Sequence, residues 1–313
     1  MSNVDPPGDP PGSPLDPRIH PYRDDLAADF LEGKVEARAF VPGKPSRAGA
    51  AFTPVMSKPV FSQPTPGELQ ASELLFGEDF TVFEDAGGWS WGQCGHDGYV
   101  GYVKSTDLYS NLPQPTHWVT PARALVFADN KGEYPAIMGL TMTARVAVEK
   151  VDGDYAKLAS GGWMFTGNLA ELGETLPDFV AVAQIFSRAP YLWGGRGGMG
   201  IDCSGLIQVA LATAGHPVPR DSDLQADVIG EDIPIPEDLS GLLPGDIVFF
   251  PGHVGIHLGS GALLHASSRE MMVVTHSLAD VIERMNERKG QGITRVRRVE
   301  KGGWRRYRIA FEE

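Results

Sequence analysis

One cysteine and two histidines carry the chemistry that this sequence could perform. Cys203 directly follows Asp202 and precedes an apolar run with helical spacing at 206–214. Because aspartate is a favoured N-cap residue, the pattern predicts a helix that begins at Cys203. The unpaired N–H groups and the positive dipole end of a helix N-terminus stabilise a thiolate, so we expect the pKa of Cys203 to lie below that of a free thiol. The alternative is a small, inert cysteine buried in a helix.

A thiol nucleophile needs a base and a group that orients this base. His253 begins the alternating run HVGIHL, in which His253 and His257 share one face of a predicted strand. The Gly-Ser-Gly segment 259–261 predicts a hairpin to the run ALLHAS, which places His265 diagonally beside His253, at roughly 7–8 Å. We therefore expect His253 to serve Cys203 as the base and His265 to hold the tautomer of His253.

Two other kinds of site are possible at these residues. His253 and His257 are four positions apart, which suits a metal ion on a helix, but on a strand roughly 13 Å separates them. We therefore expect no metal and no cofactor, and we interpret His257 and His276 as ordinary strand histidines. Ser204 lies in DCSG and not in a GxSxG elbow, so it is interpreted as a neighbour of the nucleophile.

The composition is that of a globular protein. The chain has 313 residues, 42% hydrophobic residues and a formal net charge of −13, which argues against nucleic acid and anionic membranes as main partners. Its two cysteines, Cys94 and Cys203, indicate neither a disulfide framework nor a metal knuckle. The sequence shows no secretory signal and no membrane-spanning run, so we expect a cytoplasmic protein with a free Cys203 thiol.

Shifts in composition divide the chain into five parts. A Pro- and Gly-rich tail (1–24) is predicted to be disordered, and a short amphipathic pattern (25–45) predicts a helical lead-in. Two weakly similar stretches of β-forming residues (46–112 and 113–175) predict two small all-β barrels, each with an Asp-Gly hairpin turn. The last part (176–313) combines helical and strand patterns and predicts an α+β domain.

The predicted elements of the α+β domain place the reactive residues. A glycine-rich segment, RGGMGI, leads to the Cys203 helix and is predicted to be a mobile loop. The other predicted elements are a helix at 178–188, strands at 246–250, 253–258, 262–266 and 272–275, a helix at 277–286 and a last strand at 305–311.

Several motifs occur together in a specific order. YLWGG, DCSGL, PRDSDLQ, GDIVFF, GHVGIHLG and LLHAS closely resemble the NlpC family of bacterial cell-wall cysteine peptidases, which have a papain-like core. The GGW and YVGYV runs of the first β region resemble the bacterial SH3-like domain. The whole chain resembles the dipeptidyl-peptidase VI type, a γ-D-glutamyl-L-diamino-acid endopeptidase. The resemblance implies a multidomain protein in which two small all-β SH3-like barrels precede a papain-like α+β catalytic domain.

The resemblance also implies roles for individual residues. The nucleophile falls on Cys203, the base on His253 and the orienting residue on His265, while Tyr191 and Trp193 fall on the pocket wall. The implied substrate subsites are formed by Asp202, Ser204, Arg220, Asp221 and Ser222. In this family the first β module closes one end of the groove, a role that falls on Glu73 and Tyr99.

The expected substrate is a murein-derived peptide with a free N-terminal L-alanine, a γ-linked D-glutamate and then diaminopimelate or lysine. Asp221 is expected to bind the substrate ammonium group through a charge-assisted hydrogen bond. Two alternatives stay open. The same thioester chemistry would serve an acyltransferase or amidase, because a fold does not fix a reaction. The β modules alone would also suit a non-catalytic binder of wall peptides.

Overall fold

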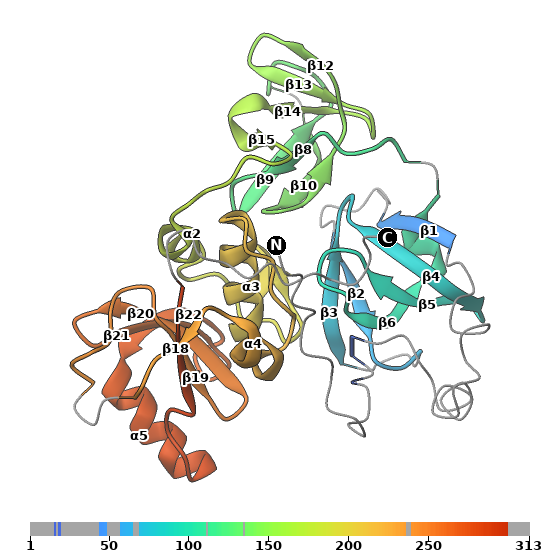
Figure 1. Ribbon diagram of the computed structural model, residues 1–313. Helices are drawn as coiled ribbons and strands as arrows, with labels where there is room; N and C mark the ends of the chain where they lie inside the picture. Colours follow the sequence, from blue (N-terminus) through green and yellow to red (C-terminus); the bar gives the residue numbers. More distant parts are fainter. Residues whose placement is uncertain are drawn as a thin grey trace, which may run out of the picture.

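The computed structural model describes residues 16, 18–19, 44–48, 57–64, 69–110, 112–133, 135–235 and 239–299. Two β modules and an α/β unit meet around a central pair of helices (Figure 1). Residues 25–43 of the predicted lead-in and the predicted strand at 305–311 lie outside the described residues. Within the described residues, no helix is both long enough and apolar enough to cross a lipid bilayer.

The first β module is one strongly curved sheet with the strand order β3-β2-β6-β5-β4-β1-β7. Its elements are β1 (Lys44–Ala48), β2 (Ser57–Phe61), β3 (Gln70–Leu75), β4 (Asp79–Ala86), β5 (Trp89–Cys94), β6 (Val100–Lys104), the 3₁₀ helix η2 (Ser105–Asp107) and β7 (Leu108–Tyr109). β1 begins inside the segment predicted as a helical lead-in. Its first two residues are extended and not helical, because they pair with β4. The predicted turn at Asp97-Gly98 is confirmed, since Gly98 has φ of +76° between the paired strands β5 and β6.

The second β module contains two sheets, with the orders β10-β9-β14-β13-β12 and β11-β8-β15. Its elements are β8 (His117–Val119), β9 (Arg123–Phe127), β10 (Ala136–Thr141), β11 (Arg145–Val146), β12 (Val148–Asp152), β13 (Tyr155–Leu158), β14 (Trp163–Phe165), η3 (Thr166–Asn168) and β15 (Leu169–Glu171). Phe76 of the first module belongs to the same hydrophobic cluster as Val126 and Leu158, and its carbonyl accepts from the Arg145 N–H at 2.7 Å. The two modules are therefore packed against each other.

The α/β unit is built on a six-stranded antiparallel sheet with the order β18-β23-β19-β20-β21-β22. Its strands are β18 (Glu231–Asp232), β19 (Ile247–Phe250), β20 (His253–Gly259), β21 (Ala262–Ser267), β22 (Met272–Ser277) and β23 (Arg295–Arg298). Its helices are α2 (Phe179–Ile185), α3 (Cys203–Thr213), α4 (Ser222–Val228) and α5 (Leu278–Lys289). Leu206 and Ile207 of α3 pack with Val254 and Ile256 of β20, which fixes the Cys203 helix against the sheet.

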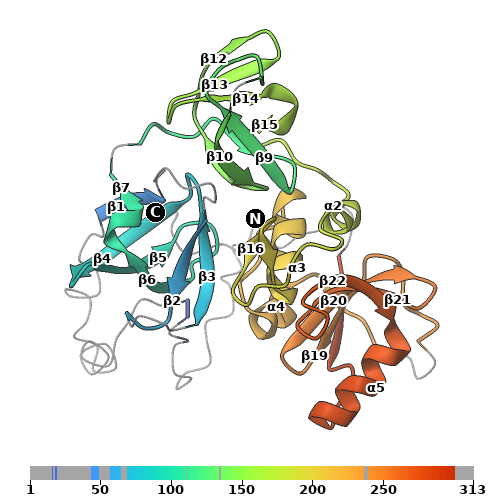
Figure 2. The ribbon, with the colours of Figure 1, turned by 180° about the vertical axis from the view of Figure 1, so that it is seen from behind.

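The glycine-rich segment is paired and packed. It forms the short hairpin β16 (Arg196–Gly197) and β17 (Gly200–Ile201). Figure 2 shows β16 and α3 between the first β module and the sheet of the α/β unit. A side chain on Gly198 would place its Cβ 1.9 Å from the Ala122 carbonyl oxygen of the second module, and one on Gly194 would lie 2.7 Å from the Gln70 oxygen of the first. The glycines thus allow the segment to approach both modules closely.

Candidate active site

Cys203 is the first residue of α3, as the sequence predicts. The Asp202 carboxylate caps the helix by accepting from the Gly205 N–H at 2.8 Å. The Cys203 thiol borders a cavity of about 340 Å³ that is also lined by Tyr191, Trp193 and both predicted catalytic histidines. Trp193 is 59% exposed, so its ring is accessible to a ligand in this cavity.

The two histidines lie on neighbouring strands. Ile256 is opposite Leu264 in the pairing of β20 with β21, which puts His265 diagonally beside His253, as predicted from the hairpin. His253 Nε2 lies 2.8 Å from His265 Nδ1, within hydrogen-bond distance. The predicted contact between the two imidazoles is therefore confirmed, and it leaves His253 Nδ1 as the nitrogen not engaged by His265.

The predicted low pKa of Cys203 is wrong. Burial, and after it the negative charge of Asp202, raises the pKa of the thiol to about 12, against the lowering effect of hydrogen bonds from the Val254 and Ser204 backbone. Burial likewise lowers the pKa of His253 to about 4. Burial therefore favours the neutral thiol of Cys203 and the neutral imidazole of His253.

Three predicted subsite residues form a buried cluster beneath the start of α3. Arg220 Nη2 lies 2.6 Å from Asp202 Oδ2, and Arg220 Nη1 donates to Ser204 Oγ at 2.8 Å. The Gly194 N–H also donates to Asp202 Oδ2 at 2.8 Å, which ties the glycine-rich segment to the cluster. These contacts fix the start of α3, where Cys203 lies. Direct contact of Asp202, Ser204 and Arg220 with substrate stays a prediction.

Asp221 and Ser222 lie at the start of α4, where Asp221 is the N-cap residue. Burial raises the pKa of Asp221, while the positive charges of Arg220 and Arg18 lower it. Arg18 Nη1 lies 3.0 Å from Asp221 Oδ2. Burial raises the pKa of Tyr99 most, and the neighbouring Asp221 charge raises it further. The structure thus brings Asp221 and Tyr99 together, and it adds Arg18, which the sequence predicted to be part of a disordered tail.

The segment around Arg18 is held by the first β module. The Val100 N–H donates to the Arg18 carbonyl at 2.8 Å, and Gln93 Nε2 donates to the Ile19 carbonyl at 3.0 Å. Arg18 also contacts Asp16 and Asp223. The Arg18 contacts with Asp221 and Asp223 join residues more than two hundred positions apart, so they carried no local sequence signal.

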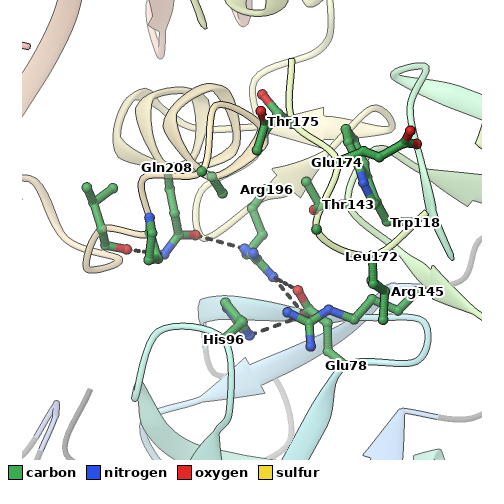
Figure 3. Close-up of a pocket in the computed structure, with 16 residues that line it drawn as sticks. Glu78, His96, Trp118, Thr143, Arg145, Leu172, Glu174, Thr175, Arg196 and Gln208 are labelled. Atoms are coloured by element: carbon green, nitrogen blue, oxygen red, sulfur yellow. Dashed lines mark hydrogen bonds and ion pairs between the residues drawn. The ribbon is translucent and has the colours of Figure 1, made fainter. Parts of the chain in front are cut away.

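Glu73 belongs to a polar junction between the first module and the α/β unit. Glu73 Oε2 accepts from the Arg196 N–H at 2.8 Å, and the Arg196 guanidinium lies 2.8 Å from Glu78. Arg196 Nε donates to Gln208 Oε1 at 2.8 Å, as Figure 3 shows beside a second cavity of about 300 Å³. Glu73 thus holds the hairpin that follows Trp193. Its direct contact with substrate stays a prediction.

Three groups at this junction carry possible metal-ligand atoms. Cys94, His96 and Asp97 place such atoms within 4.8 Å of one another. The Asp97 carboxylate already accepts from the Tyr99 N–H at 2.9 Å and from Gln208 Nε2 at 2.9 Å. Because Asp97 is committed to these bonds, we interpret the group as part of the polar junction.

Sequence reasoning missed that a third histidine, His276, extends the contact between His253 and His265 into a row of three imidazoles. His265 is opposite Val274, so the diagonal relation that joins His253 to His265 also joins His265 to His276. His265 Nε2 lies 3.1 Å from His276 Nδ1. Arg284 of α5 also approaches His276 Nδ1, at 3.1 Å from its Nη2. The alternation in MVVTHS, applied to β22, would have found His276.

A cysteine at the start of a central helix that packs on an antiparallel sheet is the arrangement of a papain-like α+β fold. Residues 188–307 match the NlpC/P60 family, and residues 60–108 match the bacterial dipeptidyl-peptidase Sh3 domain. The chain therefore contains an NlpC/P60 domain, which is a cysteine peptidase domain, and a bacterial SH3 domain ahead of it.

Two curated relatives span most of the same architecture. The chain is 26% identical to the gamma-D-glutamyl-L-lysine dipeptidyl-peptidase of Bacillus subtilis (strain 168), over 66% of this chain and 77% of the relative. It is 27% identical to dipeptidyl-peptidase 6 of Lysinibacillus sphaericus, over 69% of this chain and 87% of the relative. A solved NlpC/P60 family protein from Bacillus cereus ATCC 10987 has the same fold, with a TM-score of 0.65, 18% identity and coverage of 79% of this chain and 98% of that one.

Proposed function

We propose that this peptidase hydrolyses the bond between γ-D-glutamate and a diamino acid in murein-derived peptides that begin with a free L-alanine. The observation that carries the proposal is the bond of 2.8 Å between His253 Nε2 and His265 Nδ1 beside the Cys203 thiol in one cavity. The substrate class is supported by the similarity to the gamma-D-glutamyl-L-lysine dipeptidyl-peptidase of Bacillus subtilis.

The chemistry begins from two neutral groups. As Cys203 Sγ attacks the γ-carbonyl carbon of D-glutamate, its proton moves to His253 Nδ1, and the imidazolium is held by its Nε2–H bond to His265. The backbone N–H of Cys203 contributes to an oxyanion hole for the tetrahedral intermediate. His253 then gives its proton to the leaving amine, and a thioester remains. His253 next takes a proton from water as the water oxygen attacks the thioester carbonyl carbon. The carbon–sulfur bond then breaks, the peptide leaves with a free D-glutamate γ-carboxyl group, and His253 returns the proton to Cys203 Sγ.

The proposed subsites comprise the aromatic walls of the Cys203 cavity and an acidic group, Asp221, that is not among the residues lining this cavity. Tyr191 and Trp193 provide the walls beside Cys203. Asp221 binds the ammonium group of L-alanine, and its neighbour Tyr99 from the first module limits the space beyond this group. Because an acylated amine has no positive charge and needs more room, the enzyme selects peptides with a free N-terminus.

The test compares L-Ala-γ-D-Glu-diaminopimelate with its N-acetylated form. We expect cleavage of the free peptide alone, and loss of this activity in Cys203→Ala. Cys94→Ala is the matched control, because Cys94 is buried in the first module and its thiol takes no part in the chemistry. Undiminished cleavage by Cys203→Ala would exclude the thiol mechanism, and equal cleavage of both peptides would exclude the role of Asp221.

A further inference from the structure

We infer that Arg284 and His276 are positioning residues that fix the tautomers of His265 and His253, so that His253 Nδ1 carries the lone pair that accepts the Cys203 proton. This inference deepens the proposed function and rests on it. The observation behind it is an uninterrupted row of three imidazoles, from His253 at the thiol to His276 at the base of α5.

The donor-to-acceptor direction of the hydrogen bonds along the row is set by Arg284, at the end farthest from Cys203. A guanidinium has five N–H donors and no acceptor, so Arg284 Nη2, at 3.1 Å, can only donate to His276 Nδ1. His276 Nδ1 must therefore carry a lone pair, since an N–H there would point at another N–H. The His276 proton is then on Nε2, on the side of the Glu270 carboxylate, whose Oε1 is 3.9 Å away.

The requirement that an N–H faces a lone pair then applies to each imidazole ring in turn. His265 Nε2 faces the same lone pair of His276 Nδ1 at 3.1 Å, so it carries an N–H and shares this lone pair with Arg284 as a second donor. A neutral imidazole has one N–H, so His265 Nδ1 is an acceptor. His253 Nε2, at 2.8 Å from this acceptor, therefore carries the His253 proton and leaves Nδ1 unprotonated. Burial lowers the pKa of His265 to about 2, which keeps its ring neutral.

Arg284 is itself held in place. Its Nε donates to the Asp280 carbonyl at 3.0 Å one turn earlier in α5, and its Nη1 lies 3.8 Å from Glu270 Oε1. A hydrogen bond from Ser267 lowers the pKa of Glu270, so this carboxylate is ionised at neutral pH. The positive charge of Arg284 also lowers the pKa of His253, and the negative charge of Asp202 raises it. Glu270 offsets the Arg284 charge without touching His253.

The distinguishing experiment changes the end of the row from a pure donor to a group that can also accept. In Arg284→Gln the amide oxygen can face an N–H on His276 Nδ1, and the row can reverse. We expect long-range ¹H–¹⁵N NMR of ¹⁵N-histidine-labelled protein to show the Nε2–H tautomer of His253 in the parent and a mixture of tautomers in the variant. For turnover of the free tripeptide, we expect kcat to fall roughly ten-fold or more, with KM changed less than two-fold.

Arg284→Lys is the conservative variant, since an ammonium group also only donates, and it should keep both the tautomer and most of kcat. Glu283→Gln, at an exposed neighbouring position of α5, is the matched control. An unchanged Nε2–H tautomer in Arg284→Gln overturns the inference. If this variant fails to fold, the same two measurements on His276→Gln decide. The NMR result does not require turnover, so an inactive parent would overturn the proposed function and leave the tautomer assignment to be judged separately.

Discussion

Burial favours the neutral form of both the proposed nucleophile, Cys203, and its proposed base, His253. The sequence correctly places Cys203 at a helix N-terminus with Asp202 as its cap. It does not show that the sulfur is buried beside that carboxylate, and burial and the carboxylate charge both disfavour a thiolate. In the proposed mechanism, Cys203 is therefore activated by proton transfer to His253 during the attack.

The reactivity of the thiol tests this picture. With a pKa of about 12, the fraction of Cys203 present as thiolate rises about ten-fold for each pH unit below that value. We expect the rate of alkylation by iodoacetamide to climb steadily between pH 6 and 9.5, measured by mass spectrometry in a Cys94→Ala background. A plateau from about pH 5 upward would instead show a thiolate–imidazolium pair in the resting enzyme.

At the scale of elements, a single hairpin brings the histidines together. The Gly-Ser-Gly signal and the alternation of β20 and β21 were sufficient to predict the His253–His265 contact. β23 was not predicted, because RVRR contains a single apolar residue. Its Arg297 is satisfied by carbonyl oxygens, with Nε donating to Ala226 O at 2.7 Å. Such long-range partners have no local signature in the sequence.

Gly255 is the point where the hairpin tolerates no side chain. A Cβ at Gly255 would lie 2.9 Å from Leu263 Cγ, 3.0 Å from the Leu264 oxygen and 3.1 Å from His265 Cβ. We expect Gly255→Ala to push β21 away, to lower the free energy of unfolding by about 1–3 kcal/mol and to reduce kcat through the displaced His265.

Urea unfolding and steady-state kinetics would measure both effects of Gly255→Ala. Gly167→Ala is the control, because the added Cβ there meets the exposed Phe165 ring, which can turn aside. If Gly255→Ala were as active and as stable as this control, β20 and β21 would not need the close approach that we describe.

At the scale of the whole molecule, one cation of the N-terminal segment occupies the carboxylate proposed to bind substrate. Arg18 contacts Asp221 at 3.0 Å, so a peptide ammonium group must displace the guanidinium before it binds. Because the Arg18 side chain is one-third exposed, the pair is worth about 1 kcal/mol or less.

We therefore expect Arg18→Ala to lower KM for the free tripeptide about two- to five-fold and to leave kcat unchanged. Steady-state kinetics of the parent and the variant would show it. Arg123→Ala, which removes an exposed arginine from β9, is the control and should alter neither constant. A higher KM in Arg18→Ala would mean that Arg18 helps to hold the substrate, contrary to competition with it.

The polar junction at Arg196 also has a consequence for how this architecture can change over evolutionary time. The backbone of Arg196 binds Glu73 and its guanidinium binds Glu78, both from the first module, while Gln208 of α3 binds Arg196 on one side and Asp97 on the other. A peptidase domain inherited without this SH3 module would retain a buried cation without its counterion. The SH3 module and the peptidase domain are therefore expected to be inherited together, and the cavity beside Cys203 is inherited with them.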